Sequence, residues 1–424
     1  MAVMNPSAAQ ERFVRFVRPR DRDLELWHGR RAGPEGAITT YGADAAYPIG
    51  QLDQNLRQYA IGCATIYDQL GNAAYDPTII HLLTGLRPVK TRGQTVPVRL
   101  EDPSPILHDL RLRRAPAELA SQRRACALAS EAHIEAMRYA RPGLYAYEVQ
   151  AALACVFRRR GSARNASPSI VASGPHACLL HDTANARRLE DGELLLIDAG
   201  GEDGYDAADL TRTFPVNGRF TAAQRTLYAL VLQAQLAAIA VAQLGNRYEA
   251  MHEAARRVLT EGLVALGLLP RGVEESLAMH HERAFYRHAT GHWLGMDVHD
   301  VGDDRVDRQS RVLEPGMVLT VEPGLSVDPE REAATLALRE YDEAAIRERR
   351  DRLGMAVASQ LEREEQAHAP KITHPIPAEF RGLGMRIEDD VLITAGGHDV
   401  LTRGTPKTSD AVERVCAEAS SFPR

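Results

Sequence analysis

The segment LLLIDAGGEDGYDAADLTRT, residues 194–213, contains two aspartates whose spacing would allow their carboxylates to act together. Asp198 ends an apolar run, and Asp209 follows eleven residues later. The Asp203-Gly204 pair between them is a strong signal for a two-residue hairpin turn, which would place Asp198 directly opposite Asp209. Residues opposite each other have β-carbons about 4.5–5.5 Å apart, and two carboxylates that close repel unless a proton or a cation lies between them. The segment therefore predicts a cation site, although a turn cap or an acidic surface hairpin would also fit.

A second segment, YRHATGHWLGMDVHDVGDD at residues 286–304, contains His288, His292 and His299. The first two have the i, i+4 spacing of helical zinc ligands, but no glutamate follows the first histidine. Gly291 and Gly295 also make a continuous helix a poor fit, because glycine is unfavourable inside helices. We therefore expect one histidine to be a metal ligand and the other two to handle substrate or protons.

Two glutamates lie where an unpaired charge is disfavoured. Glu322 ends the apolar run MVLTV, and Glu388 interrupts a strand pattern in GMRIEDDVLIT. A charge facing water at a strand end is the alternative for each. Together with Asp198, Asp209 and one imidazole, the glutamates form an oxygen-rich set that could bind two divalent ions. Manganese suits such ligands, and cobalt, iron or zinc could also occupy them.

Two divalent ions about 3.5–4 Å apart can share a bridging hydroxide and polarise a carbonyl, so the chemistry expected is hydrolysis. No serine or cysteine nucleophile is then required. The sequence contains no G-x-S-x-G motif, no phosphate-binding loop of the P-loop type and no dinucleotide fingerprint.

The composition of the 424 residues, 44% hydrophobic and 25% charged, is that of a soluble globular protein. No apolar run reaches the roughly 18 residues that span a membrane. The net charge of -6 argues against nucleic-acid or membrane-surface binding, and the basic clusters at 111–124 and 157–161 are interpreted as solvated helix faces. The five cysteines are dispersed, without a C-x-x-C pair, which together with the absence of a signal peptide predicts a cytoplasmic protein.

The positioning elements are expected to belong to an α+β fold with a mainly antiparallel sheet. Residues 1–105 look like a small α/β unit, and residues 101–106 like a linker. Helical patterns at 116–141, 146–160 and 221–268 alternate with short strands, and Thr221 is a candidate N-cap. The charge-dense stretch 328–370 predicts one or two exposed helices between two core strands.

These motifs, in this order, resemble the proline-specific metallopeptidases of the pita-bread fold. The motifs that carry the resemblance are LLIDAGGEDGYDAADLTRTFPVNGRFT, GHWLGMDVHDVG, LEPGMVLTVEPGL and GMRIEDDVLIT, within residues 107–402. The form HWL favours Xaa-Pro aminopeptidase over the sister type, Xaa-Pro dipeptidase. The resemblance implies a truncated N-terminal α/β domain at 1–105 and a pita-bread catalytic domain at 106–424, with a helical insertion at 328–376.

The resemblance also implies a role for each site residue. Asp198 would bind one ion, Asp209 and Glu388 would bridge both ions, and His292 and Glu322 would complete the second. Glu322 would also carry the proton of the bridging hydroxide. His181 would contact the substrate near the scissile bond, and His288 would line the proline pocket. His299 would support the tetrahedral intermediate, and Arg386 would be a cation on the substrate side.

The expected activity is hydrolysis of the bond between an N-terminal residue and a following proline. The alternatives are a dipeptidase confined to Xaa-Pro dipeptides, a binding module without catalysis, and metal-free amidinohydrolysis. All five ligand positions are filled, which argues against the last two. The resemblance implies a homo-oligomer, dimer or tetramer. Two departures from the family are the shortened N-terminal domain and Asp182, which stands where tyrosine is common.

Overall fold

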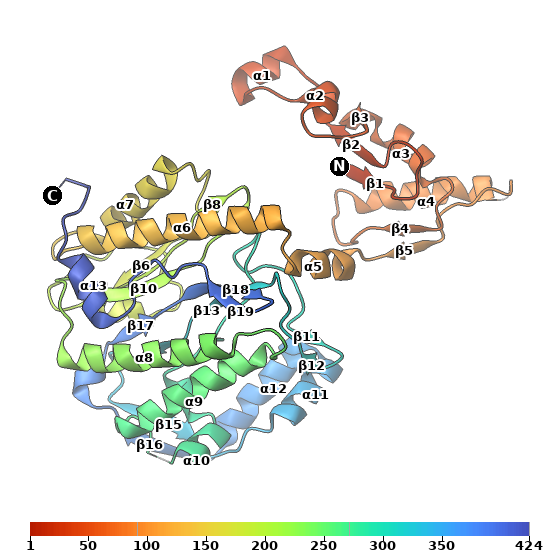
Figure 1. Cartoon of the computed structure of the whole chain (residues 1–424). Helices are drawn as coiled ribbons and strands as arrows, with labels where there is room; N and C mark the ends of the chain where they lie inside the picture. Colours follow the sequence, from red (N-terminus) through yellow and green to blue (C-terminus); the bar gives the residue numbers. More distant parts are fainter. Residues whose placement is uncertain (91, 271, 424) are drawn as a thin grey trace. The chain divides into compact units, whose positions relative to one another are not determined.

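The computed structural model describes residues 1–90, 92–270 and 272–423. The chain divides into two compact units, Met1–Leu107 and His108–Arg424 (Figure 1). The division lies next to the linker expected at 101–106, and the assignment of the units as family domains stays a prediction. Among the described residues, no helix has both the length and the apolar character needed to cross a bilayer.

Unit 1 is a small α/β structure. Strands β1 (Ala2–Met4), β2 (Phe13–Val17) and β3 (Ala45–Pro48) form one sheet, and β4 (Thr65–Tyr67) pairs in parallel with β5 (Arg99–Glu101). The helices are α1 (Arg22–His28), α2 (Gly33–Thr39), α3 (Leu52–Ala60) and α4 (Asp76–Lys90). β2 and β3 run parallel, as their helical crossover through α1 and α2 requires. Val14, Phe16 and Leu86 are the most buried of its core side chains.

Unit 2 contains the segments with the candidate ligands. Its strands are β6 (Ile170–Ser173), β7 (Leu194–Asp198), β8 (Glu202–Asp203), β9 (Asp206–Ala207), β10 (Thr211–Pro215), β11 (Arg305–Val306), β12 (Gln309–Ser310), β13 (Val318–Val321), β14 (Gly324–Ser326), β15 (Ala333–Ala337), β16 (Lys371–Pro375), β17 (Gly384–Arg386), β18 (Asp389–Thr394) and β19 (Gly397–Val400). Every pairing among these strands is antiparallel, which confirms the α+β prediction for the described part of this unit.

The helices are α5 (Ser104–Leu112), which crosses the division, α6 (Pro116–Tyr139), α7 (Ala146–Arg159), α8 (Ala222–Val241), α9 (Glu249–Ala265), α10 (Val273–Ala278), α11 (Glu343–Leu353), α12 (Met355–His368) and α13 (Ser409–Cys416). Short 3₁₀ turns η1 (Ile49–Gln51), η2 (Gly174–Cys178), η3 (His281–Ala284) and η4 (Ala378–Phe380) complete the described elements. Thr221 caps α8 as predicted, because its hydroxyl accepts the Gln224 backbone N–H.

Helices cover one face of β7 and β13, and the other face carries Asp198 and Thr320 together with the apolar Leu196 and Val318. α8 and α9 pack with Leu319 and Val321 of β13, whose neighbour Thr320 points to the opposite side. α6 and α7 pack with Leu195 and Ile197 of β7. Because side chains alternate along a strand, residues at even positions of these strands reach the face without helices. This alternation gathers the candidate ligands.

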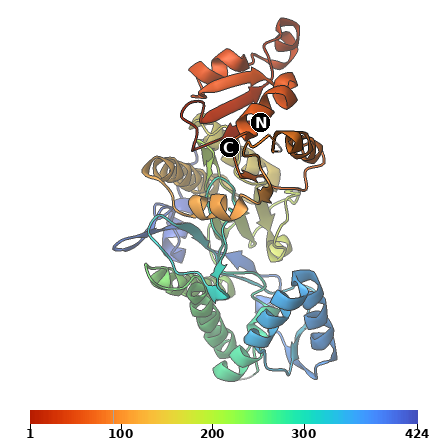
Figure 2. The same cartoon turned by 90° about the vertical axis from the view of Figure 1, so that its right-hand side faces the viewer.

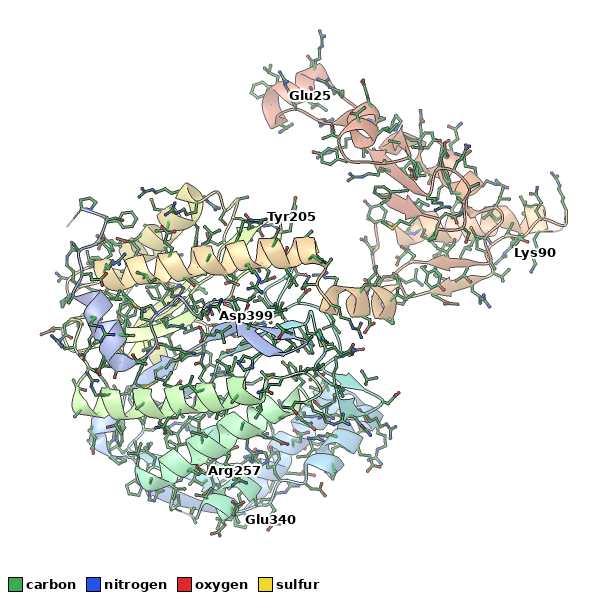
Figure 3. The ribbon with its side chains drawn as sticks, viewed as in Figure 1. Glu25, Lys90, Tyr205, Arg257, Glu340 and Asp399 are labelled. Atoms are coloured by element: carbon green, nitrogen blue, oxygen red, sulfur yellow. The ribbon has the colours of Figure 1, made fainter. Side chains whose placement is uncertain are left out.

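The predicted turn at Asp203 and Gly204 is wrong by one residue. The turn residues are Gly204 and Tyr205, with φ of 57° and 77°, and Asp203 pairs with Asp206. Asp203 ends β8, and its carboxylate is bound by Arg124 of α6 at 2.7 Å. The exposed Tyr205 ring (Figure 3) lies under the Arg164 guanidinium, 5.3 Å from it.

The corrected register changes the partner of Asp198. Asp198 is paired with Thr211, and Asp209 lies two residues before Thr211. The two aspartates are therefore diagonal neighbours on one face, a relation that separates two residues by about 7–8 Å, with their β-carbons somewhat closer. This separation leaves more room for ions between the carboxylates than direct opposition would.

The segment at 328–376 contains the expected helices and a pair of strands that the sequence did not reveal. α11 and α12 lie side by side and are joined by the ion pair of Arg350 with Glu362 at 2.8 Å (Figures 1 and 2). β15 and β16 pair antiparallel at the root of the segment. The alternation of apolar and polar residues in β15 and β16 is short and interrupted by polar residues. The sequence pattern of the segment is therefore mainly that of its charge-dense helices. That the segment is an insertion relative to the family stays a prediction.

A buried ion pair ties β10 to β18. Arg212 donates to Asp389 at 2.8 Å, and both side chains are fully buried. Asp389 also accepts hydrogen bonds from Gln235, Thr402 and Lys407, at 2.8, 2.8 and 2.6 Å. Burial opposes the charged carboxylate, but Arg212 and Lys407 outweigh it and hold the pKa of Asp389 well below its usual range.

We predict that Asp389→Asn destabilises the protein by about 3–5 kcal/mol at pH 7, because it leaves Arg212 buried without a counter-charge. The folded pKa is lowered, so the stabilisation is present above the unfolded pKa of about 3.9 and is lost as pH falls below it. Urea unfolding at several pH values should show the difference between parent and variant shrinking in acid. Asp410→Asn, which removes an exposed ion pair with Arg225, is the control and should cost about 0–1 kcal/mol. Equal stability of parent and Asp389→Asn would contradict the assignment.

Candidate metal centre

The five predicted ligands come from the ends of four strands and one loop of unit 2. Asp198 ends β7, and Asp209 stands between β9 and β10. Glu322 directly follows β13, and Glu388 lies between β17 and β18. His292 precedes β13, with its carbonyl accepting the Thr320 N–H at 2.9 Å. Residues nearly 200 positions apart are thus brought to one site by strand pairing.

Three of these residues form a compact ligand set. Asp209, His292 and Glu388 each offer one ligand atom, and these atoms lie within 4.8 Å of one another. Nε2 of His292 lies 3.4 Å from Asp209 Oδ2 and 3.4 Å from Glu322 Oε1, which adds the fourth residue. The fifth, Asp198, is held by the guanidinium of Arg386.

The electrostatics of this site call for positive charge. Burial first, and then the charge of Asp198, raise the pKa of Asp209 to about 7. Burial and the neighbouring carboxylates likewise raise the pKa of Glu388 and Glu322. Burial lowers the pKa of His292, but its hydrogen bond to Asp209 and the charge of Glu322 prevail and raise that pKa to about 9. Such a group of acids is unfavourable without a proton or a cation.

The residues present fit divalent metal ions. Among the described residues, Oδ1 of the buried Asp209 has no hydrogen-bond partner, although buried carboxylate oxygens almost always have one. Nδ1 of His292 lies 3.0 Å from the Trp293 carbonyl, an arrangement that turns Nε2 toward the carboxylates, as in metal-binding histidines. Oxygen-rich ligands with a single imidazole suit hard or borderline cations.

Two glycines allow the ligand segments to approach closely. A β-carbon on Gly200 would lie 1.6 Å from the Ala208 carbonyl oxygen, next to Asp209. One on Gly291 would lie 2.0 Å from the Thr320 carbonyl oxygen, next to His292. Neither backbone can shift without moving a ligand, so any larger residue at these positions would displace the site.

The other predicted site residues surround this set at different distances. The His299 ring lies 4.3 Å from the His292 ring, edge to face, and burial and the charge of His292 lower the pKa of His299. His288 Nδ1 lies 3.7 Å from Glu322 Oε2. Burial, followed by the charge of Arg386, lowers the pKa of His288 to about 4. His181 is exposed and reaches the site only through the effect of its charge on His299.

Two threonines that the sequence analysis did not single out hold ligands in place. Thr211 donates to Glu388 Oε2 at 2.6 Å and accepts from Arg386 Nε at 3.1 Å. Thr320 donates to Glu322 Oε1 at 3.2 Å and accepts the His292 N–H at 3.1 Å. Each threonine lies two positions from a ligand on the same strand face. Period-two alternation from Asp209 and Glu322 was the signal that could have identified them.

Buried carboxylates gathered with an imidazole at the polar face of an α+β sheet define a metal-dependent hydrolytic centre. The family model for metallopeptidase family M24 matches residues 120–395, and that for the aminopeptidase P N-terminal domain matches residues 1–67. The chain belongs to metallopeptidase family M24. Membership in this family implies divalent metal ions, and it confirms the resemblance drawn from the motifs.

The relatives agree with this assignment. The Xaa-Pro aminopeptidase of Escherichia coli K12 is 36% identical over 407 residues, covering 96% of this chain and 82% of the relative. Human Xaa-Pro aminopeptidase 3 is 30% identical over 96% of this chain and 71% of its own length. The structure of Pseudomonas aeruginosa aminopeptidase PepP superposes with a TM-score of 0.84 at 40% identity, covering 98% of this chain and 84% of that one. The predicted fold class is therefore confirmed.

We predict that Asp209→Asn lowers the affinity for manganese more than about 100-fold, since loss of an outer-shell partner alone costs about 10–100-fold. The measurement is calorimetric titration of metal-stripped protein, together with the metal content of protein purified in manganese. Asp203→Asn, in the neighbouring strand and bound to Arg124 at the surface, is the matched control and should bind like the parent. Unchanged metal binding and hydrolysis in Asp209→Asn would refute its role as a ligand.

Thr211 provides a finer test, because its hydroxyl donates a hydrogen bond to the Glu388 carboxylate. We expect Thr211→Val, which keeps the shape of the side chain, to weaken manganese binding by about 10–100-fold. Thr211→Ser retains the hydroxyl and should bind nearly as the parent does. If Val and Ser variants bind metal equally, the hydrogen bond does not position Glu388.

Proposed function

We propose that this chain is an Xaa-Pro aminopeptidase, which removes an N-terminal residue when proline follows it. The observation that carries the proposal is the ligand set of Asp209, His292, Glu322 and Glu388, in a chain aligned over 96% of its length with an Xaa-Pro aminopeptidase. Asp198 is proposed as the fifth ligand. The roles of the metal-binding and substrate-binding side chains belong to the same proposal.

Asp209 and Glu388 would hold two ions jointly, with Asp198 on one side and His292 and Glu322 on the other. Manganese fits this carboxylate-rich set first, and cobalt, iron or zinc are alternatives. When bound, divalent ions supply a water that is nucleophilic at neutral pH and polarise the carbonyl to be attacked. The protein's own groups must then orient the peptide and move protons.

Glu322 is placed to carry a proton between the attacking water and the leaving nitrogen. Its carboxylate lies between Thr320 and His292, and burial raises its pKa above the ordinary value. A carboxyl group within reach of both the water and the leaving nitrogen can act as base and then as acid. His299, with its lowered pKa, would be neutral at pH 7 and able to donate a hydrogen bond to the oxygen that gains charge. Arg386 would balance carboxylate charge beside Asp198.

Substrate recognition must work without a backbone donor at the proline, because the Xaa-Pro bond has no N–H. His288 packs edge to face on the buried Tyr286, with ring centroids 5.2 Å apart, and supplies a flat surface for a ring. We assign His288 to the proline pocket and His181 to contact near the scissile bond. Both assignments require a peptide substrate with proline in its second position.

Other properties follow as proposals. The five cysteines are free thiols, which supports a reducing, cytoplasmic location. The resemblance supports a homo-oligomer, a division into domains at 1–105 and 106–424 and an insertion at 328–376. An Xaa-Pro dipeptidase is the alternative activity, since the same metal ligands would serve both enzymes.

The deciding assay compares Xaa-Pro dipeptides with Xaa-Pro peptides of three to six residues, using purified protein and manganese. We expect release of the N-terminal residue from the longer peptides, and no release when alanine replaces proline. Hydrolysis confined to dipeptides would instead identify a dipeptidase. A protein that neither binds manganese nor cleaves any of these peptides would be a binding module.

A further inference from the structure

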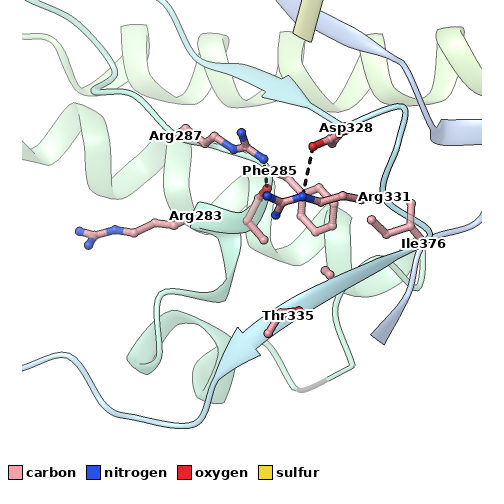
Figure 4. A pocket seen from close by; sticks show the side chains of 9 residues that line it. Arg283, Phe285, Arg287, Asp328, Arg331, Thr335 and Ile376 are labelled. Carbon is pink, nitrogen blue, oxygen red and sulfur yellow. Dashed lines mark hydrogen bonds and ion pairs between the residues drawn. The ribbon is translucent and has the colours of Figure 1, made fainter. Parts of the chain in front are cut away.

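A small cavity opens at the root of the β15–β16 segment, apart from the ligand set (Figure 4). Its volume is about 170 Å³, room for roughly five water molecules at about 30 Å³ each. Its walls come from the chain around η3, from the turn after β14, and from β15 with Ile376. We call it the arginine pocket, after Arg283, Arg287 and Arg331.

The arginine pocket carries an excess of positive charge. Its single acidic lining residue is Asp328, whose carboxylate lies 3.1 Å from Nε of Arg331. Arg287 makes one weak hydrogen bond, to the Ala284 carbonyl at 3.4 Å, and Arg283 stacks on Tyr341 at 4.6 Å. In the described part of the chain, neither Arg283 nor Arg287 forms an ion pair with a carboxylate. Two guanidinium groups are therefore left without a counter-charge.

The pocket also has an apolar floor. Phe285, Ala334 and Ile376 are buried beneath the charged rim. In Figure 4 Arg287 and Arg331 are directed toward Phe285, whereas Arg283 extends away. A cleft lined by one sign of charge on low-dielectric walls concentrates its field on a small bound ion. Planar guanidinium groups pair with carboxylate or phosphate through two parallel hydrogen bonds, which water cannot match in geometry.

We propose that the arginine pocket binds a single oxyanion group, a carboxylate or a tetrahedral oxyanion, through Arg287 and Arg331. Asp328 holds Arg331 in place and leaves its other N–H groups available. Arg283 contributes charge at the rim. Nothing in the metal centre requires these residues.

Two sources could supply the oxyanion. One is a free inorganic anion. The other is the C-terminal carboxylate of a short peptide substrate, because Arg287 directly precedes His288, whose Nδ1 lies 3.7 Å from Glu322. Asp328 likewise follows Glu322 by six residues, through β14. This second source rests on the proposed function, while the first does not.

The first experiment is calorimetric titration of the manganese-loaded full chain with sulfate, at constant ionic strength. We expect Arg287→Ala and Arg331→Ala each to weaken sulfate binding by about tenfold, the size of a lost charge-assisted hydrogen bond. Arg287→Lys should keep only part of the sulfate affinity, because lysine keeps the positive charge but lacks the two parallel N–H groups of the guanidinium. Arg352→Ala, an exposed arginine of α11 outside the pocket, is the charge-matched control and should bind as the parent. Manganese content verifies that each variant is folded.

The second experiment compares Xaa-Pro peptides of three to six residues that end in a free carboxylate or an amide. A lower KM for the carboxylate form, lost in Arg287→Ala with kcat unchanged, identifies the peptide as the source. Sulfate binding that depends on Arg287, without any carboxylate preference, identifies a free anion. Sulfate binding that is absent or equal in parent and pocket variants, with no carboxylate preference, overturns the proposal. If no Xaa-Pro peptide is cleaved, the proposed function fails, and the sulfate titration alone decides the pocket.

Discussion

Repulsion among buried carboxylates is the constraint on which the site depends. Asp198, Asp209, Glu322 and Glu388 converge from separate strands, and burial together with their mutual charge raises the pKa of the last three. His292 and Arg386 supply only part of the positive charge that four carboxylates require. A fold that holds these groups together against their repulsion makes sense as a scaffold for cations.

Further contacts join the strands around the candidate ligands to one another. The pair of Arg212 and Asp389 lies next to Glu388 in the structure, and Arg212 also donates to the Glu388 carbonyl at 2.5 Å. The Thr213 hydroxyl accepts the Arg386 N–H at 3.1 Å, which joins β10 to β17. Helices α8 and α9 press the strands together from the other face. The ion pair of Arg212 with Asp389 thus helps to hold the strands together against the repulsion among the candidate ligand carboxylates.

The sequence predicted which acidic and histidine side chains converge better than it predicted the register of their strands. Asp198 was singled out because it ends an apolar run, and Asp209 because the expected turn brought it close to Asp198. The other motifs supplied the remaining candidate ligands. The register was wrong because a turn signal such as Asp203-Gly204 describes local preference, whereas the pairing of the strands along the whole hairpin places Gly204 and Tyr205 in the turn. Contacts between segments far apart in sequence leave no local signal at all. The same reason hid the β15–β16 strands and the arginine pocket, since no local pattern brings Arg287 near Arg331.

The proposed ligands are dispersed along the chain, which would tie metal binding to folding. Asp198 and Glu388 are separated by 190 residues, so an unfolded chain cannot present them together without a large loss of entropy. A metal ion that binds only the folded ligand set stabilises that set by its binding free energy. Protons compete for the same oxygens, because the pKa of Asp209 is raised to about 7 in the protein without metal. Metal uptake therefore releases protons near neutral pH, and the cost of collecting the carboxylates is offset only when cations replace those protons.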